Sequence, residues 1–230
     1  MEPSDTLLKH PSLRQLPRGV RHTSLIKTWE WSGVVVARYY SDLLERFGAS
    51  AQALDEREDE KDHQFYQHLL DGAALPAAPS ILDIGCGMGN LIKYLQSRDV
   101  DIQDYVGVDL LPQFVELCRA QYAGPFSFVE ANFVSDSFQP DRKFDLVVNM
   151  GVLVSRVLLY ERYIDYSIRK MIALSSKYVL FNVITHIDGS LGNYAGRKRV
   201  GQITFIPKAS SSRFSTRQPT SSACAMSYTR

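Results

Sequence analysis

The polypeptide has 230 residues, of which 45% are hydrophobic, and a formal net charge of +1. A chain of this size and composition can bury a substantial core as one globular domain. The near-zero charge gives no indication of a nucleic-acid or membrane partner. The sequence shows no signal-peptide pattern and no apolar run of membrane-spanning length, so we expect no membrane attachment and a cytoplasmic location. The three cysteines, Cys86, Cys118 and Cys224, lack CxxC spacing, which is typical of a reducing compartment.

The amino-terminal part, residues 1–72, is predicted to form an arm and a helical cap. Prolines interrupt residues 1–30, where we expect a loose arm or short helices. Apolar residues recur at helical spacing over 34–47, and a second helix is predicted over 62–71. The charged segment 49–61 between them is typical of a solvated loop or helix face.

Short apolar runs alternate with helical patterns through residues 73–207, which we predict to be the core domain. This alternation favours an α/β fold with a doubly wound, mostly parallel sheet. The last apolar run is apolar almost throughout, as expected for a strand that is covered on both faces. The strands are predicted at 80–84, 105–109, 126–130, 144–149 and 178–184, and the helices at 89–97, 112–122 and 158–174.

The carboxy-terminal residues are predicted to complete the sheet only in part. Residues 202–206 could add one strand, whereas residues 208–230 are rich in Ser, Thr and Arg without any period, so we expect a disordered tail. Missing last strands would leave an edge of the strand at 178–184 open. Such an edge would lower stability or promote pairing, so we expect a monomer or a homodimer.

The most informative stretch is SILDIGCGMGN, Ser80–Asn90, in which a predicted strand runs into a turn with alternating glycines at 85, 87 and 89. Glycines in such a turn permit positive φ and let the backbone approach a ligand closely. The spacing differs from the phosphate-binding loop GxxxxGK[ST] and from the dinucleotide pattern GxGxxG, which would require glycine at position 90. Asp83 is unfavourable beside a pyrophosphate but suits a cationic ligand, such as an ammonium or sulfonium group.

Further polar residues follow the ends of the other predicted strands, where open α/β sheets bind ligands. Asp109 ends the second strand, at a place where a carboxylate can accept both hydroxyls of a ribose. Asn132 and Phe133 follow the third strand and could meet an adenine, Phe133 by stacking. The fourth strand ends in Asn149-Met150-Gly151, where backbone and amide groups could reach the same ligand.

These motifs resemble those of the class I S-adenosylmethionine-dependent methyltransferases. Asp83–Gly89 is similar to the family's first motif, an acid followed by GxGxG. Val106–Asp109 is similar to its ribose-binding motif, and Phe144–Asn149 to its motif at the fourth strand. The resemblance covers about residues 60–185.

The resemblance implies S-adenosyl-L-methionine as the cofactor and S-adenosyl-L-homocysteine as its product. It places Gly85 and Gly87 along the methionine part and Asp109 at the ribose. Many members have Asp where this chain has Asn132, whose carbonyl can still accept from the adenine amino group. The implied cofactor-binding residues are Asp83, Gly85, Cys86, Gly87, Gly89, Asp109, Leu110, Asn132, Phe133, Asn149 and Met150.

Methyl transfer from a sulfonium mainly requires a nucleophile aligned with the carbon–sulfur bond. A base is needed only if the acceptor must lose a proton. His186, just after the fifth predicted strand, is the preferred candidate, and His63 is the alternative. Tyr39 and Tyr40 could form a lid or wall of the site, although plain packing on a helix face stays open. No metal is expected.

The sequence gives the least information about the methyl acceptor. A helix-rich amino-terminal cap favours a small molecule, methylated on O or N. The residues Asn149–Leu153 lack the Asn/Asp-Pro-Pro-Tyr/Phe signature of enzymes that methylate amino groups of nucleic acids. One alternative is an RNA or protein methyltransferase that docks through its basic residues. The other is a methyltransferase-like protein that binds the cofactor without transferring a methyl group. The basic residues in question are Arg14, Arg18, Arg21 and 197–199.

Overall fold

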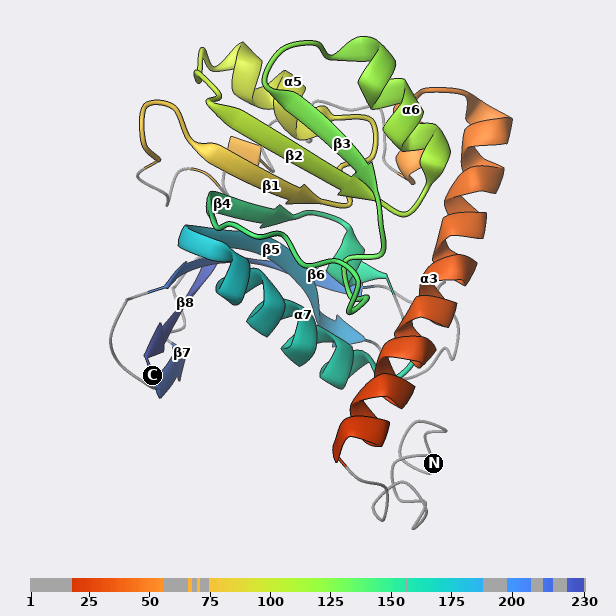
Figure 1. Ribbon diagram of the computed structural model, residues 1–230, viewed down its shortest axis with the longest axis vertical. Helices are drawn as coiled ribbons and strands as arrows, with labels where there is room; N and C mark the ends of the chain where they lie inside the picture. The colour runs from red at the N-terminus through yellow and green to blue at the C-terminus, as the bar shows by residue number, and fades with distance from the viewer. Residues whose placement is uncertain are drawn as a thin grey trace.

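The computed structural model describes residues 18–55, 66–67, 70, 75–155, 157–187, 198–207, 213–216 and 223–229. Side chains are described from His22 to Val183 within these ranges. An eight-stranded sheet runs through the molecule in the order β3-β2-β1-β4-β5-β6-β8-β7 (Figure 1). Its first five strands are parallel to their neighbours. They are β1 Ser80–Ile84, β2 Asp104–Asp109, β3 Phe126–Glu130, β4 Phe144–Asn149 and β5 Ser175–Ile187. The α/β prediction and the five predicted strands are therefore confirmed.

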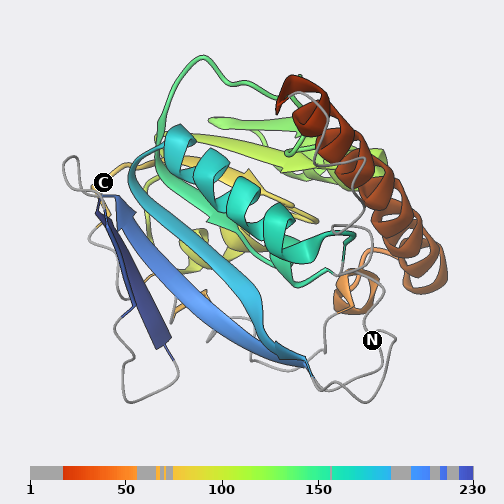
Figure 2. The same cartoon turned by 90° about the horizontal axis from the view of Figure 1, so that it is seen from below.

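Helices cover both faces of the parallel strands (Figures 1 and 2). On one face, α5 (Asn90–Ser97) and α6 (Pro112–Gln121) pack against alternate residues of the strands, including Ile81 and Leu146. On the other face, α7 (Tyr160–Leu174) packs against the intervening residues, including Leu82 and Val147. Because both faces are covered, the strands are apolar on both sides.

The long helix α3 (Arg18–Phe47) corrects the prediction for the amino-terminal residues. A loose arm or short helices were expected over residues 1–30, but the helix already begins at Arg18. Its buried residues Ile26 and Trp29 join the core beside α7, so tertiary packing stabilises a segment whose local pattern is weak. The helix ends where Gly48 takes φ +64° and donates its N–H to the Leu44 carbonyl at 2.9 Å, a common carboxy-terminal cap.

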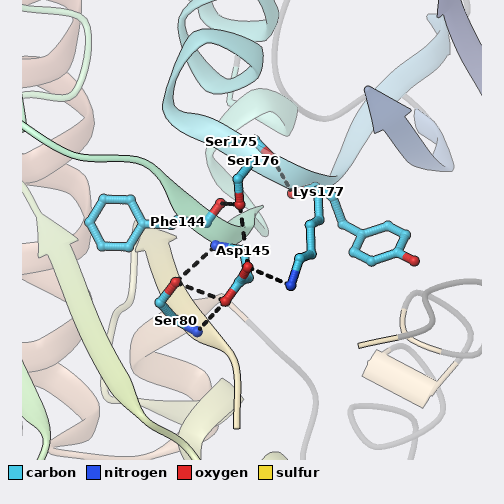
Figure 3. A network of polar contacts seen from close by, with 7 residues as sticks. Ser80, Phe144, Asp145, Ser175, Ser176 and Lys177 are labelled. Carbon is cyan, nitrogen blue, oxygen red and sulfur yellow. Dashed lines mark hydrogen bonds and ion pairs between the residues drawn. The ribbon is translucent and has the colours of Figure 1, made fainter. Parts of the chain in front are cut away.

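A polar network joins the amino-terminal ends of three strands (Figure 3). The Asp145 carboxylate in β4 accepts from the backbone N–H and the hydroxyl of Ser80 in β1, both at 3.1 Å. It also accepts from Ser176 in β5 at 3.3 Å and pairs with the Lys177 ammonium at 2.9 Å. These contacts hold the amino-terminal ends of the three strands together. The carboxyl ends lie at the opposite edge of the sheet and take no part in the network.

The carboxy-terminal strands differ from the prediction. The segment expected at 202–206 is the longer strand β6 (Lys198–Pro207), which pairs antiparallel with β5 from Val179↔Phe205 to Ile187↔Lys198. The outer edge of β5 is therefore covered rather than open. The tail 208–230, expected to be disordered, contains β7 (Arg213–Thr216) and β8 (Ala223–Thr229).

Several remaining predictions lie at or beyond the limits of the described residues. Tyr66, Gln67 and Leu70 of the predicted helix 62–71 are helical. Two short 3₁₀ helices, η1 (Ala51–Leu54) and η2 (Val152–Val154), were not predicted. His63, Arg14, Arg197 and residues 56–61 of the charged segment lie outside the described residues.

Candidate functional site

A cavity of about 530 Å³ lies at the carboxyl ends of β1, β2 and β4 and is closed on one side by α3. The structure brings most of the residues expected at the site to this cavity. Those that line it are Asp83, Gly85, Cys86, Gly87, Asp109, Leu110, Asn132, Phe133 and Met150. Gly89 and Asn149 are not among the lining residues, and their contact with a ligand stays a prediction.

The glycine turn needs glycine for space as well as for backbone conformation. Gly85 has φ +75° and Gly87 φ +51°. A Cβ added at Gly85 would lie 2.1 Å from Cγ2 of Val152, and one at Gly87 would lie 3.0 Å from Cδ2 of Leu54. Side chains at these positions would therefore clash with η2 and η1, which close over the turn.

Asp109 links the end of β2 to the glycine turn. One carboxylate oxygen accepts the backbone N–H of Gly87 at 2.9 Å, and the other accepts that of Leu111 at 2.9 Å. Burial raises the pKa of this carboxyl, and the N–H donors of Leu111 and Gly87 oppose that effect. Each oxygen of a carboxylate has further lone pairs, so Asp109 can still accept hydroxyl groups from the cavity.

Asp83 is a buried acid at the end of β1. Its carboxylate accepts the Tyr105 hydroxyl at 2.5 Å. Burial raises the pKa of Asp83 to about 7, an effect that the Tyr105 hydrogen bond opposes and the charge of Asp109 reinforces. A carboxyl with such a pKa is poised to ionise when a cation enters the cavity.

The residues after β3 are partly committed to the fold. The Asn132 side-chain carbonyl accepts the backbone N–H of Val134 at 3.2 Å. Phe133 is buried, its ring 6.0 Å from that of Phe138 and 5.4 Å from Nζ of Lys170. Both residues line the cavity, but adenine stacking on Phe133 stays a prediction.

The two expected residues that miss the cavity have different surroundings. Gly89 faces the Tyr122 ring, which a Cβ would approach to 2.5 Å. Asn149 is fully buried, and neither polar atom of its side chain has a hydrogen-bond partner within the described part of the chain. The next residues do reach the cavity, and the backbone N–H of Gly151 donates to the Asn182 side-chain carbonyl at 2.9 Å.

Of the two tyrosines expected as a lid or wall of the site, Tyr40 lines the cavity from α3 and forms a hydrogen bond with Ser155. Burial raises the pKa of Tyr40 to about 12, and the nearby Asp55 carboxylate adds to this rise. Tyr39 is not among the lining residues and is largely exposed. The lining residues not predicted include Trp29, Gly33, Leu54, Asp55, Ser155, Tyr163 and Asn182.

Cys86 lies within the glycine turn and is buried. The hydrogen bond with Cys118 and burial both raise the pKa of its thiol, so the neutral form is favoured. Cys118 in turn donates to the Gly87 carbonyl at 3.2 Å. The two thiols are free and serve here as packing around the turn.

His186 lies near the carboxyl end of β5, four residues beyond Asn182, and its backbone pairs with Arg199. Its side chain lies outside the described residues, so its role as a base stays a prediction. The same applies to the side chains of Arg18, Arg21 and 198–199 as a docking surface.

Residues 81–163 match a protein-family model described as a methyltransferase domain. This segment of the chain is therefore similar to methyltransferase domains. The matched segment includes the glycine turn, Asp109 and the end of β4, which is where the cavity lies. The parallel strands that hold the cavity lie in the order β3, β2, β1, β4 and β5.

A protein of Mycobacterium tuberculosis provisionally named a methyltransferase, Rv1506c, is 29% identical over 110 residues. This match covers 46% of the present chain and 63% of the relative. Among solved structures, a methyltransferase of Haloferax volcanii in complex with the activator Trm112 has 18% identity and a TM-score of 0.47, covering 62% of this chain and 59% of that one. Magnesium protoporphyrin IX methyltransferase of Synechocystis PCC 6803 with bound S-adenosylhomocysteine has 18% identity and a TM-score of 0.43, covering 56% of each chain.

Within the described residues, no helix is both long and apolar enough to cross a membrane.

Proposed function

We propose that this protein binds S-adenosyl-L-methionine in the cavity and transfers its methyl group to a small-molecule acceptor by in-line displacement. One observation carries the proposal: Asp83, the glycine turn and Asp109 line one cavity at the carboxyl edge of the sheet. This arrangement offers two carboxylates and a backbone free of side chains to one ligand. A cationic nucleoside matches these features better than a phosphate-bearing one, because the two acids would repel phosphate.

The residues present fit this cofactor. The cavity volume of about 530 Å³ lies within the range of small-molecule sites. The lone pairs of Asp109 that are not used by Gly87 and Leu111 would hold the ribose hydroxyls. Asp83 would provide a negative charge for the cationic end, and the backbone of Gly85 would lie along it.

The bound cofactor would supply a methyl group that its sulfonium already activates. The protein then has to bind, orient and exclude water, which can contribute several kcal/mol to the reaction. Trp29, Val36 and Tyr40 from α3 wall the cavity and would limit access of water. The neutral phenol of Tyr40 would orient a polar group of the acceptor through its hydroxyl, because its raised pKa keeps it protonated near pH 7.

The nature of the cavity supports a small acceptor. Its walls combine aromatic and aliphatic side chains with few polar groups, among them Ser155 and Asn182, a composition typical of small-molecule sites. His186 remains our candidate base for an acceptor that must lose a proton.

Calorimetric titration with S-adenosyl-L-methionine and S-adenosyl-L-homocysteine tests cofactor binding. We expect both to bind. We expect Asp109→Ala to weaken binding by about 1–3 kcal/mol, because charged hydrogen bonds are lost. Asp101→Ala is the matched control, since Asp101 is exposed and does not line the cavity. Absence of heat with either compound would reject the cofactor, and equal affinity of Asp109→Ala and Asp101→Ala would reject the ribose role.

Transfer of a labelled methyl group to a cell extract, separated into metabolite, RNA and protein fractions, tests the acceptor. We expect label in the metabolite fraction. Label confined to RNA or protein would favour the docking alternative. Cofactor binding without any labelled fraction would favour a protein that has the fold but not the activity.

A further inference from the structure

The two faces of α3 differ sharply in what covers them. The inner face carries buried Ile26 and Trp29 and contributes to the cavity wall. On the outer face, Trp31 is 62% exposed, Val34 66% and Val35 53%. In both views α3 runs along one side of the molecule (Figures 1 and 2). Grouped exposed apolar side chains of this size mark interaction surfaces.

We propose that the outer face of α3 packs antiparallel against α3 of a second copy of this chain, with the two-fold axis between Val34 and Val35. The resulting homodimer is independent of the methyl-transfer proposal and uses no residue of the cavity.

The argument rests on the charges that flank this apolar centre. The exposed residues Lys27, Trp31, Val34, Arg38 and Asp42 follow one another at intervals of three and four along α3, so they form one stripe on its surface. The centre of the stripe is apolar, its outermost residues Lys27 and Asp42 carry opposite charges, and Arg38 lies between Val34 and Asp42. A two-fold axis exchanges the two ends, so such a stripe is complementary to itself.

The axis at Val34 and Val35 gives specific pairs, each formed twice. Trp31 meets Arg38 of the partner subunit, a cation and an indole ring that attract each other. Lys27 meets Asp42 of the partner subunit, an ion pair at the rim. A parallel arrangement would instead oppose Lys27 to Lys27 of the partner subunit and Asp42 to Asp42 of the partner subunit. Charge therefore selects the antiparallel orientation.

A single pair of helices forms a small interface, so the dimer should depend on protein concentration. Sedimentation velocity over a wide concentration range measures this directly. We expect Trp31→Lys to weaken association at least about tenfold, because a central aromatic anchor is replaced by a cation that faces Arg38 of the partner subunit. Phe47→Glu is the matched control: it is 45% exposed on the same helix but lies off the stripe, and it should leave association unchanged.

A charge-swap experiment tests the register. Lys27→Asp and Asp42→Lys should each weaken the dimer, because each brings like charges together. The double variant Lys27→Asp/Asp42→Lys should restore it, since the ion pairs are re-formed with reversed polarity. Circular dichroism and thermal melting would establish that each variant is folded. A chain that is monomeric at all concentrations, a dimer indifferent to Trp31→Lys, or a double variant without rescue would overturn the proposal.

Discussion

A buried, ionised carboxylate at the end of β1 destabilises the folded state unless hydrogen bonds or a nearby cation compensate its charge. Asp83 has one hydrogen bond from Tyr105, and burial holds its pKa at about 7 against an ordinary value of 3.8. Because the folded-state pKa is raised, Asp83 favours folding most at pH values below 3.8, and this contribution is lost as the pH rises through about 7. A cationic ligand reverses the preference, since it stabilises the ionised form.

This coupling predicts a pH dependence of cofactor affinity. Between pH 6 and pH 8 Asp83 changes from mostly neutral to mostly ionised, so the affinity for S-adenosyl-L-methionine should rise by up to about tenfold relative to Asp83→Asn. Titration calorimetry of both proteins at the two pH values measures the difference, in which the ligand's own titration cancels. Asp101→Asn should retain the wild-type profile. If the affinities of wild type and Asp83→Asn changed equally between the two pH values, Asp83 would not interact with the cationic group of the ligand.

Some residues of the site belong to a local sequence pattern and could be predicted, whereas others are brought to the cavity only by tertiary packing. The glycine turn, Asp83 and Asp109 could be read from the sequence, because a strand that ends in glycines or an acid is a local pattern. Tyr40 and Ser155 come from α3 and from the segment after η2, so only tertiary packing brings them together. Asn182 is one polar residue inside an apolar strand, a signal that can be seen in the sequence but does not specify a ligand. Asn149 ends β4 but does not line the cavity, so its role there stays a prediction, whereas the neighbouring Met150 and Gly151 line it.

At the scale of elements, the parallel strands are held in place at their amino-terminal ends by Asp145. Four donors from β1 and β5 converge on its carboxylate (Figure 3). Burial by itself raises the pKa of Asp145, but the Lys177 and Ser80 contacts outweigh it and the net shift is downward. The ionised form therefore stabilises the fold at pH values above its unfolded-state pKa, and this contribution is lost as the pH falls through the folded-state value.

We expect Asp145→Ala to lower the free energy of unfolding by about 1–3 kcal/mol at pH 7, because the half-buried donors of Ser80 lose their acceptor. For a chain of this size that corresponds to about 2–4 °C in Tm per kcal/mol. Lys177→Ala should cost at most about 1 kcal/mol, because the lysine is half exposed and its ion pair is screened. Thermal melts at pH 7 and pH 3 provide the measurement, and the loss caused by Asp145→Ala should shrink at the lower pH. Equal losses for both variants would mean that charge pairing, rather than the Ser80 contacts, dominates.

The elements themselves were predictable to different degrees. The strands β1, β3 and β4 have the predicted bounds, because short apolar runs between turn residues define a buried parallel strand. The helix α3 was underestimated at its beginning, since residues 18–33 are stabilised by contacts of Trp29 with Tyr163 and Tyr166 that no local pattern contains. The strands β6, β7 and β8 were missed or shortened for a related reason: pairing with a neighbour can recruit a polar segment of weak intrinsic preference.

At the scale of the whole molecule, the sheet changes character across β5. Beyond that strand, β6 runs antiparallel, β8 pairs parallel with β6, and β7 forms the final edge. The parallel part carries the cavity, whereas the last three strands extend the sheet away from it (Figure 2). We therefore expect the carboxy-terminal strands to affect stability and association more than cofactor affinity.

A chain that ends at Pro207 tests this division. This shortening removes β7 and β8 and would expose the edge of β6 that pairs with Ala223–Tyr228. Unpaired strand edges promote association. We expect a lower melting temperature or added self-association, with the affinity for S-adenosyl-L-homocysteine retained. The experiment is best done with Trp31→Lys in both the full and the shortened chain, so that any added association cannot arise from α3. An unchanged melting temperature without added association would show that β7 and β8 do not stabilise the sheet. A loss of cofactor affinity in a shortened chain that still melts cooperatively would show that the two parts of the sheet are not independent.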